Sequence, residues 1–457
     1  MNDNQGEGLD YNRRDFLRGG SVATLMTMLG GVELFAQTNA ASGEAKAPAA
    51  KIKVAVIGLG TWGRELVNTL ARLPHANVAA ICDTYAASLR RTASAAPGAE
   101  QIADYKEILA KKDIRAVIIA TPSHKHKQIV LDALKAGKHV YCEAPIANTA
   151  EEAREIALAA KAATKSQIFQ VGLQKRSDPQ RHFLLPFIRS GALGKTVMAR
   201  AQWHKKTSWR AASPNPEHEK NLNWRLDKAT SLGLIGEIGV HQIDQAAWFM
   251  NMLPTAVTGF GSVMFWKDGR DVPDTVQTVL EFPGGVQMIY DATLASSFDG
   301  EYEMLYGSDA TVMMREAKAW MFKEVDSPLL GWEVYAPKMT FYKETGISLA
   351  AGQSKPPPVD ANGQPILPDP LTTTAHYAAL DNFLRNAVDF DATAEDYKAS
   401  YGDDDAEGLA AALAKVAKRP GADYADGYRA VVMSIKANEA ILSGKRVEIK
   451  PEMLQLA

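Results

Sequence analysis

The 457-residue sequence is poor in cysteine, in net charge and in long apolar runs. Two cysteines cannot form a disulfide framework, and both Cys82 and Cys142 lie in apolar stretches that favour buried, unreactive thiols. The formal net charge of −2 gives no reason to expect nucleic acid or an anionic membrane as a partner. Beyond the N-terminal region, no apolar run is long enough to span a membrane.

The N-terminal region has the pattern of a targeting segment. Asn12-Arg-Arg-Asp-Phe-Leu-Arg18 places paired arginines before a mildly apolar stretch that ends near Ala36, which resembles a twin-arginine export signal. The apolar part is short and is interrupted by Glu33. The alternative is a chance arginine pair in an amphipathic helix. We predict an export signal over residues 1–36, a linker over residues 37–50, and a soluble protein that is periplasmic or otherwise exported.

A glycine-rich turn between a strand and a helix is the most informative motif. Gly58 permits a tight turn off the apolar strand, Gly60 lets the backbone approach a pyrophosphate, and Gly63 lets the following helix pack closely. Amides at the start of that helix then face the diphosphate. The cofactor-binding residues predicted in this turn are Gly58, Gly60, Thr61, Trp62 and Gly63. The alternative is a structural glycine turn in some other α/β domain.

The second strand ends in an acid that bears on which dinucleotide is bound. Asp83 follows the apolar residues 78–82 of the predicted strand 77–82 and lies twenty residues beyond Gly63. A carboxylate at this strand end accepts a hydrogen bond from the ribose 2′-OH and repels a 2′-phosphate. We therefore predict NAD as the cofactor.

Two patterns of strands and helices divide the remaining chain. Residues 51–172 alternate apolar strands with helical stretches, which indicates a doubly wound parallel sheet, a Rossmann NAD-binding domain. Residues 173–457 contain strands that alternate inward and outward, with a hairpin formed by residues 274–282 and 286–294. We predict an α/β protein in which this second region is an α+β domain with a large, mostly antiparallel open sheet.

A set of ionisable residues lies in the second region. Read as one helix, residues 236–249 place Glu237, His241 and Asp244 on one face among apolar neighbours, where their pKa values can be tuned for catalysis. A buried histidine with capping acids is an alternative reading. A metal site is another, but it lacks a second His or Cys at ligand spacing, so we predict no metal.

A substrate surface is predicted in two stretches where aromatic and cationic residues alternate with polar ones. Such side chains suit stacking on sugar faces and bonding to sugar hydroxyls. A surface loop anchored by buried tryptophans is the alternative. The candidate substrate residues are His204, Lys205, Trp209, Arg210, Trp224 and Arg225.

Four motifs in this order resemble the glucose–fructose oxidoreductase and inositol dehydrogenase family, called Gfo/Idh/MocA. They are Val56-Ile-Gly-Leu-Gly-Thr-Trp-Gly63, Thr121-Pro-Ser-His-Lys-His126, Ala136-Gly-Lys-His-Val-Tyr-Cys-Glu143 and Glu237-Ile-Gly-Val-His-Gln-Ile-Asp244. The resemblance implies a Rossmann domain that binds NAD(P) and a second domain whose open sheet often serves oligomerisation, so we expect a homo-oligomer. It also implies a sugar or cyclitol substrate between the two domains.

The resemblance assigns further residues to the site. Glu237 and His241 take the places of an Asp and a His, four apart, that face the reacting carbon in the common pattern. Gln174 and Arg176 flank the cleft, and we include both among the predicted cofactor-binding residues. The residues implied to line the nicotinamide side are Thr121, Pro122, Ser123, His126 and Glu143.

One departure from the family pattern affects the chemistry. The family's dehydrogenases usually read Glu-Lys-Pro, with the lysine near the substrate hydroxyl, whereas this chain reads Glu143-Ala-Pro145. Because alanine cannot donate, accept or hold charge, a proton must be transferred elsewhere. His241 is the candidate, assisted by Glu237 or by a residue such as His204 or Lys205. The substitution resembles the family's NAD-dependent glycosidase branches.

Export adds a constraint, because an exported enzyme leaves the cytosolic NAD pool behind. We therefore expect tightly held NAD that is reduced and re-oxidised within each cycle. Three functions remain open. The first is an oxidoreductase acting on a sugar or sugar derivative. The second is a redox-neutral glycoside hydrolase or lyase that works through transient oxidation and elimination. The third is a non-catalytic sugar-binding protein that retains the fold.

Overall fold

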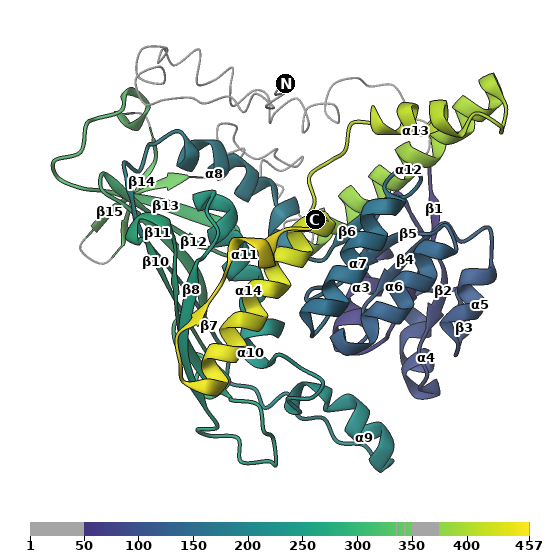
Figure 1. The fold of residues 1–457 in the computed structure, drawn as a ribbon, viewed down its shortest axis with the longest axis horizontal. Coiled ribbons are helices and arrows are strands. Elements are labelled where there is room, and N and C mark those ends of the chain that lie inside the picture. Colours follow the sequence, from purple (N-terminus) through teal and green to yellow (C-terminus); the bar gives the residue numbers. More distant parts are fainter. Residues whose placement is uncertain (1–49, 335, 342–343, 350–373, 457) are drawn as a thin grey trace, which may run out of the picture.

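The computed structural model describes residues 50–334, 336–341, 344–349 and 374–456. The predicted export signal and all but the last residue of the predicted linker lie outside these residues. The described chain forms two sheets, one of six strands and one of ten. Figure 1 shows the two sheets side by side, with helices between them.

The first sheet is parallel throughout, with the strand order β3-β2-β1-β4-β5-β6. The predicted doubly wound sheet is therefore confirmed. The chain continues from β1 in one direction to β2 and β3, and in the other to β4, β5 and β6. Ligands of open α/β sheets bind beyond the strand carboxyl ends at this reversal. The strands are β1 (Ile52–Ile57), β2 (Ala76–Cys82), β3 (Glu100–Ile102), β4 (Ala116–Ile119), β5 (His139–Cys142) and β6 (Phe169–Val171).

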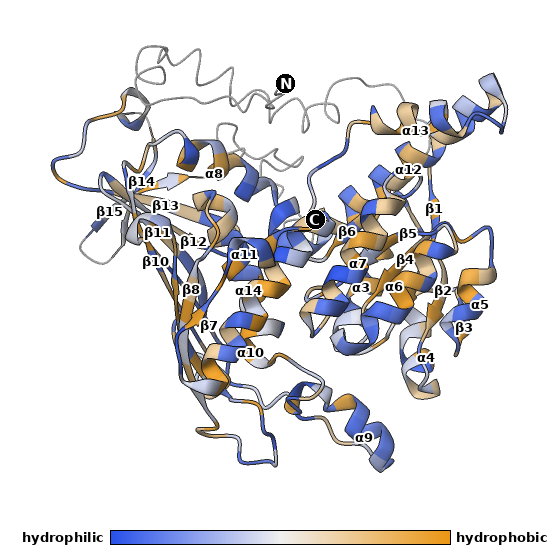
Figure 2. Ribbon diagram, in the orientation of Figure 1, coloured by the Kyte–Doolittle hydropathy of each residue, from blue (hydrophilic) through white to orange (hydrophobic). Residues whose placement is uncertain are grey.

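Helices cover the faces of this sheet, which explains why its central strands are apolar along their whole length. Every residue of β4 and β5 is buried, and Figure 2 shows the strands as an apolar layer among helices with polar outer faces. Thr149 begins the longest of the crossover helices by accepting a hydrogen bond from the N–H of Glu152. These helices are α3 (Thr61–Leu70), α4 (Ala86–Thr92), α5 (Tyr105–Ala110), α6 (His126–Lys135) and α7 (Ala150–Ala163).

One helix from the C-terminal part of the chain also covers the first sheet. Helix α12 (Ala375–Tyr401) packs Phe383 edge-on against Tyr141 of β5, with ring centroids 5.6 Å apart. Arg115, which precedes β4, pairs with Asp391 at 2.6 Å. The prediction of one second domain over residues 173–457 included α12 and did not anticipate that this helix packs on the first sheet. By packing, α12 belongs to the first sheet.

The second sheet is large and mostly antiparallel, as predicted. Its order is β14-β15-β13-β12-β11-β7-β10-β9-β8-β16, and among the described strands only β7 and β10 pair in parallel. The predicted hairpin is confirmed, because β9 and β10 pair antiparallel through a turn at Pro283–Gly285. The strands are β7 (Thr196–His204), β8 (Ala256–Ser262), β9 (Thr275–Glu281), β10 (Gln287–Thr293), β11 (Glu301–Gly307), β12 (Ala310–Arg315), β13 (Lys318–Lys323), β14 (Lys338–Phe341), β15 (Glu344–Leu349) and β16 (Val447–Glu448).

The helices of the second domain lie mainly between its sheet and the first domain (Figure 1). The opposite face of the sheet carries exposed apolar side chains at Phe260 and Ile289. In the part of the chain that the structure describes, no helix is both long and apolar enough for a membrane span. The helices are α8 (Pro179–Arg189), α9 (Pro216–Leu222), α10 (Gly233–Glu237), α11 (Gly239–Met250) and α14 (Tyr424–Ser443), whereas α13 (Ala406–Ala414) lies beside α12 and buries Leu413 in the core of the first domain.

Candidate cofactor site and active site

The glycine turn joins β1 to α3 with the close packing that the motif requires. Gly58 has φ of +95°, and a Cβ there would lie 2.7 Å from the backbone nitrogen of Thr121. A Cβ on Gly63 would lie 1.9 Å from the Gly58 carbonyl oxygen. In contrast, a Cβ on Gly60 would meet no described atom within 4 Å. Gly60 precedes α3 without a side-chain cap, so the first amides of that helix are available to an anion.

Asp83 joins the same site from the end of β2. Its carboxylate oxygens accept hydrogen bonds from the N–H groups of Leu59 at 2.9 Å and Tyr85 at 2.8 Å, which hold it against the glycine turn. Each oxygen has a second lone pair that can accept from a ribose hydroxyl. Thr61 is exposed at the start of α3. An open glycine, uncapped helix amides and a strand-end carboxylate together fit NAD.

The loop after β4 connects this site to the second domain. Ser123 donates a hydrogen bond to Oε1 of Glu237 at 3.1 Å. The His126 ring lies 2.8 Å from the Thr121 carbonyl oxygen and 3.1 Å from the Pro145 carbonyl oxygen. Burial lowers the pKa of His126 to about 4, so the ring is neutral at pH 7. Through these two contacts, the buried His126 ring connects the loop after β4 to the loop after β5.

Glu143 follows β5 and is buried at the same end of the sheet. Burial raises its pKa to about 7, against the opposing effect of Trp62, the backbone of Ala144 and Gln174. Its Oε1 has no hydrogen-bond partner among the described residues. A carboxyl group with this pKa can hold or release a proton near neutral pH. Trp62, Glu143 and Gln174, all predicted cofactor residues, thus come together.

The predicted continuous helix over residues 236–249 is wrong. Helix α10 ends at Glu237, Ile238 has φ of −121°, and α11 begins at Gly239. Glycines on both sides of Ile238 weaken the helix there, and Gly239 lies so close to β10 that a Cβ would be 3.0 Å from the Tyr290 ring. Glu237 therefore does not share a helix face with His241 and Asp244.

Glu237 is instead the centre of an interdomain cluster, which we define as Ser123, Trp224, Arg225, Ser231 and Glu237. Its Oε1 accepts from the hydroxyls of Ser123 and, at 3.2 Å, Ser231, while Nε of Arg225 lies 3.6 Å from Oε2. The Arg225 guanidinium stacks over the Trp224 ring at 4.4 Å. Burial raises the pKa of Glu237. The cluster joins a cofactor loop of the first domain to an aromatic surface of the second.

His241 is close to two charged groups of opposite sign. Burial lowers its pKa to about 4, the positive charge of Lys175 lowers it further, and Glu301 opposes both. The Lys175 ammonium pairs with Glu301 at 2.9 Å and also with Glu303. No hydrogen bond to the His241 ring occurs within the described residues. The imidazole is therefore neutral at pH 7, with a nitrogen free to accept a proton.

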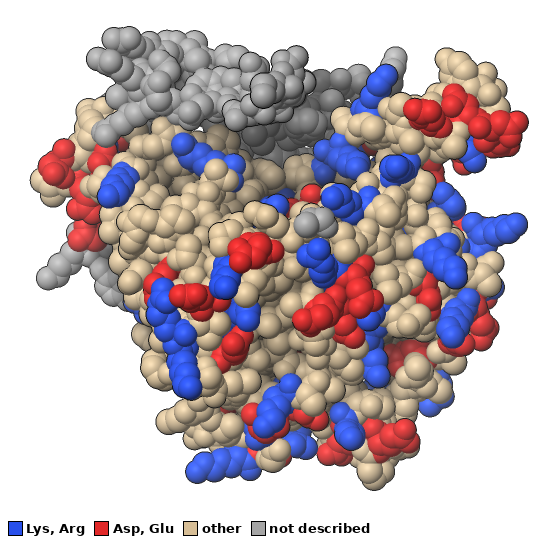
Figure 3. Space-filling view, in the orientation of Figure 1, with Lys and Arg blue, Asp and Glu red and all other residues tan. Residues whose placement is uncertain are grey.

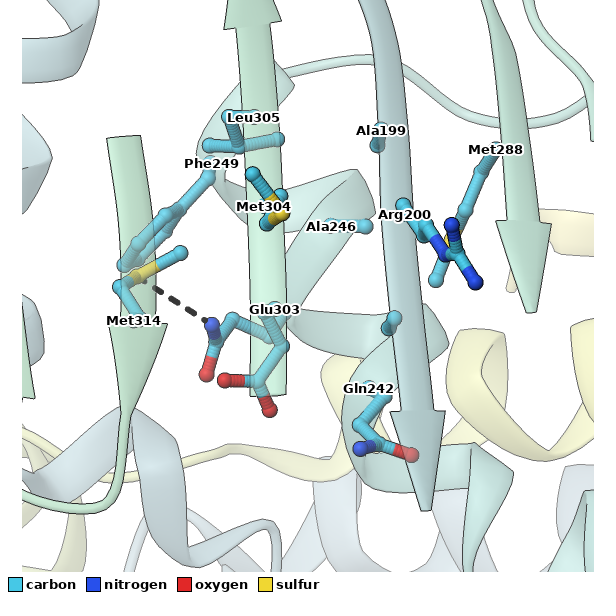
Figure 4. A pocket seen from close by; sticks show the side chains of 12 residues that line it. Ala199, Arg200, Gln242, Ala246, Phe249, Met288, Glu303, Met304, Leu305 and Met314 are labelled. Carbon is cyan, nitrogen blue, oxygen red and sulfur yellow. Dashed lines mark hydrogen bonds between the residues drawn. The ribbon is translucent and has the colours of Figure 1, made fainter. Parts of the chain in front are cut away.

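The packing of helix α11 against the second sheet determines the position of His241. Figure 4 shows the small space between α11 and the strands, with Gln242, Ala246 and Phe249 on the helix side and Glu303 and Met314 on the strands. The Gln242 amide donates to the Gln202 carbonyl of β7 at 2.8 Å. This space is part of the packed core. The side chains around it hold the first turn of α11 in place.

Asp244 and Arg176 bind one another. Arg176 donates two hydrogen bonds to the Asp244 carboxylate, at 2.8 and 2.9 Å, and its Nη1 lies 3.0 Å from Asp426 of α14. The Arg176 guanidinium also lies 5.2 Å from the centre of the Trp248 ring. Both predicted site residues are therefore engaged in fastening α11 to the turn after β6 and to α14. They position the helix that carries His241.

The structure brings three of the six predicted substrate residues together. Trp209 has φ of +62°, a backbone conformation that costs about 1–3 kcal/mol for such a residue, and its ring lies 6.0 Å from Arg225 of the interdomain cluster. Trp224 belongs to that cluster.

The other three lie elsewhere or remain exposed. His204 binds Asp291 at 2.6 Å, and Arg210 forms ion pairs with Glu219 and Asp268. Lys205 is exposed.

Three residues of the site were missed by the sequence analysis. Lys175 lies between the predicted Gln174 and Arg176, so its position in the motif was the available signal. Ser231 and Glu301 lie in no motif, and only the fold brings them to Glu237 and Lys175. In the described ranges, no group of three or more His, Cys, Asp or Glu side chains could hold a metal ion.

The fold and the site define a Rossmann-type dinucleotide-binding protein with a second α+β domain. Residues 52–173 match a family model described as an oxidoreductase family with an NAD-binding Rossmann fold. Residues 186–313 match the GFO/IDH/MocA C-terminal domain. Together these ranges cover more than half of the chain. The chain belongs to the Gfo/Idh/MocA family of oxidoreductases, and its first domain is the NAD-binding one.

Sugar and cyclitol dehydrogenases are among its relatives. The inositol 2-dehydrogenase of Rubrobacter xylanophilus is 32% identical over 205 residues, 44% of this chain and 52% of that protein. The levoglucosan dehydrogenase of Pseudarthrobacter phenanthrenivorans is 29% identical over 211 residues, 42% of this chain and 52% of that protein. The chain therefore spans about half the length of these two relatives.

Solved structures share the whole fold. A levoglucosan dehydrogenase in complex with NADH and levoglucosan aligns with a TM-score of 0.63 at 22% identity, over 87% of this chain and 99% of that one. An aldose–aldose oxidoreductase from Caulobacter crescentus aligns with a TM-score of 0.61 at 18% identity, over 87% of this chain and all of that one. At these identities the likeness shows the fold.

Proposed function

We propose that this protein oxidises a sugar or sugar derivative and keeps its NAD tightly bound through each catalytic cycle. The observation that carries the proposal is the link between Ser123 of the cofactor domain and Glu237 of the second domain. It brings the stacked Trp224 and Arg225 to the end of the sheet where the NAD turn lies. The names of the inositol and levoglucosan dehydrogenases support a polyhydroxylated substrate.

The chain's own residues supply binding and proton transfer. Bound NAD would accept a hydride from a carbon that carries a hydroxyl group. The neutral His241 imidazole accepts the hydroxyl proton, a task that Ala144 cannot perform. Glu237 and Arg225 hydrogen-bond neighbouring hydroxyls, and Trp224 packs against the face of the sugar ring.

Internal recycling of NAD follows from the proposed location. The paired arginines at residues 13–14, followed by an apolar stretch, support export by the twin-arginine route to the periplasm or beyond. An exported enzyme has no access to the cytosolic NAD pool. A second carbonyl compound would therefore have to re-oxidise the cofactor while it stays bound.

A redox-neutral glycosidase or lyase is the second candidate, favoured by Ala144 and by the pKa of about 7 at the neighbouring Glu143. Transient oxidation of a ring hydroxyl acidifies the adjacent C–H, and a base removes that proton as the glycosidic substituent leaves. Water would then add, and bound NADH would supply the hydride that reduces the ring carbonyl. A non-catalytic sugar-binding protein is a remoter alternative.

We also propose a homo-oligomer formed through the open face of the ten-stranded sheet. Phe260 is 62% exposed and Ile289 is 39% exposed on strands of that face. Exposed apolar side chains of this size favour a protein partner, and a second copy would cover both.

The experiment follows the absorbance of the reduced nicotinamide in purified protein as simple sugars, second carbonyl compounds and glycosides are added. The proposal predicts that a simple sugar reduces the bound nucleotide and that only a second carbonyl compound re-oxidises it. Cleavage of a glycoside without lasting reduction would instead establish the second candidate. A protein that binds nucleotide but reacts with neither class would be the binding protein.

A further inference from the structure

A long excursion of the second domain extends to the cofactor domain. Residues 205–230 leave β7, form α9 and return before α10. Their shape is fixed by internal bonds: the Asn223 side chain accepts from the N–H of Ala211 and donates to its carbonyl oxygen, both at 2.8 Å. Asn215 caps α9 by accepting from the N–H of His218 at 3.0 Å. Figure 1 shows α9 projecting from the second domain towards α4.

The excursion contacts the first domain through aromatic rings. The His218 ring stacks on the Tyr85 ring, with centroids 3.4 Å apart and planes 19° from parallel. A second contact places Trp224 5.9 Å from His124, which follows Ser123 in the loop after β4. The excursion therefore contacts the first domain at two places, after β2 through Tyr85 and after β4 through His124.

The position of Tyr85 connects the stack to the cofactor. Tyr85 is two residues beyond Asp83 and donates its N–H to that carboxylate at 2.8 Å. Asp83 in turn accepts from Leu59 inside the glycine turn. The stacked pair therefore lies directly beside the group that fits the adenosine ribose, at the opposite end of the dinucleotide site from Glu143 and His241.

We propose that residues 205–230 form a clasp over the adenosine end of bound NAD, closed by the stack of His218 on Tyr85. This inference rests on the proposed function, because it assumes that the first domain holds NAD through a full cycle. Release of the adenosine end requires the stack to separate, and an aromatic pair adds stabilisation beyond its buried area. The clasp thus supplies the retention that internal recycling needs.

The test measures nucleotide release from NAD-loaded full-length protein. His218→Ala removes one ring of the stack, His218→Phe keeps an aromatic ring, and Lys220→Ala changes an exposed side chain on the same helix. NADH release is followed by fluorescence after excess NAD is added. We expect release roughly 3- to 10-fold faster for His218→Ala and close to the parent rate for the other two. The affinity for ADP-ribose should fall by a similar factor, while that for nicotinamide mononucleotide stays unchanged.

Several outcomes would overturn the clasp. If His218→Ala binds nucleotide and releases it at the parent rate, the clasp is wrong while the proposed function stands. If affinity for both half-molecules falls equally, the stack acts on folding and not on the adenosine end. Tyr85→Ala repeats the test from the other ring should His218→Ala fail to fold. A parent protein that binds no nucleotide would contradict the proposed function itself.

Discussion

At the scale of single residues, the charge state of His241 is set by its surroundings. Burial and the Lys175 ammonium both disfavour the imidazolium, and Glu301 favours it. Lys175 is itself fixed by its pairs with Glu301 and Glu303. A neutral imidazole in this position can accept a proton at any pH well above about 4.

Removing the Lys175 charge should therefore change the pH dependence of the reaction. In Lys175→Met the imidazolium loses a repelling neighbour, and the two glutamates lose their counter-charge, so the pKa of His241 rises. We expect the acid limb of the kcat/KM profile to move to higher pH than in the parent. Lys195→Met is the control, because Lys195 is exposed just before β7 and belongs to no predicted site. An acid limb that does not move in Lys175→Met would exclude His241 as the base.

His126 gives a prediction about stability. Its pKa is about 4 in the folded protein and about 6.5 when unfolded. Above pH 6.5 both states are neutral and the ring makes no pH-dependent contribution. Between pH 6.5 and 4 the unfolded chain binds a proton that the folded chain excludes, so the native state loses up to about 3 kcal/mol.

The measurement compares the free energy of unfolding of the parent and His126→Gln across this pH range. The variant cannot titrate at this position. The difference in unfolding free energy between the parent and the variant should therefore fall by about 3 kcal/mol from pH 6.5 to pH 4. A difference between the two proteins that is the same at every pH would show that the His126 ring is not held neutral.

Among individual helices, strands and turns, sequence predicts the structure well where local backbone sterics or strand alternation determine it. The turn at Gly58 and Gly63 and the hairpin of β9 and β10 follow from backbone sterics and strand alternation. The break at Ile238 was not predicted, because apolar and charged residues around it keep helical spacing. The close approach of Gly239 to the Tyr290 ring, which leaves no room for a Cβ, is a tertiary effect that accompanies the break between α10 and α11.

The packing of α12 on the first sheet was likewise not predictable from the sequence, since the pattern of an amphipathic helix does not specify which sheet the helix covers. Phe383→Ala should cost about 3–5 kcal/mol of unfolding free energy, because the ring is fully buried against Tyr141. Tyr401→Ala at the exposed end of the same helix should change stability by no more than about 0.5 kcal/mol. Denaturant unfolding gives both values. Equal effects would mean that α12 does not form part of the first domain's core.

At the scale of the whole molecule, the site is assembled from parts distant in sequence. The placement of the glycine turn and of Asp83 beside one another was predictable, because each lies at a strand end with a defined spacing. The contacts of Ser123 with Glu237 and of Tyr85 with His218 depend on how two domains meet, which no local pattern encodes. Figure 3 shows acidic and basic side chains interspersed over the visible face, in keeping with the small net charge.

In the proposed reaction, a sugar C–H bond delivers its hydrogen to NAD held in this protein. The most direct measurement supplies sugars deuterated at the ring carbons, denatures the protein after one turnover, and analyses the released nucleotide by mass spectrometry. We expect one deuterium on the nicotinamide ring, lost again when a second carbonyl compound is supplied. Nucleotide that stays unlabelled with every sugar and glycoside, or a protein that holds none, would contradict it.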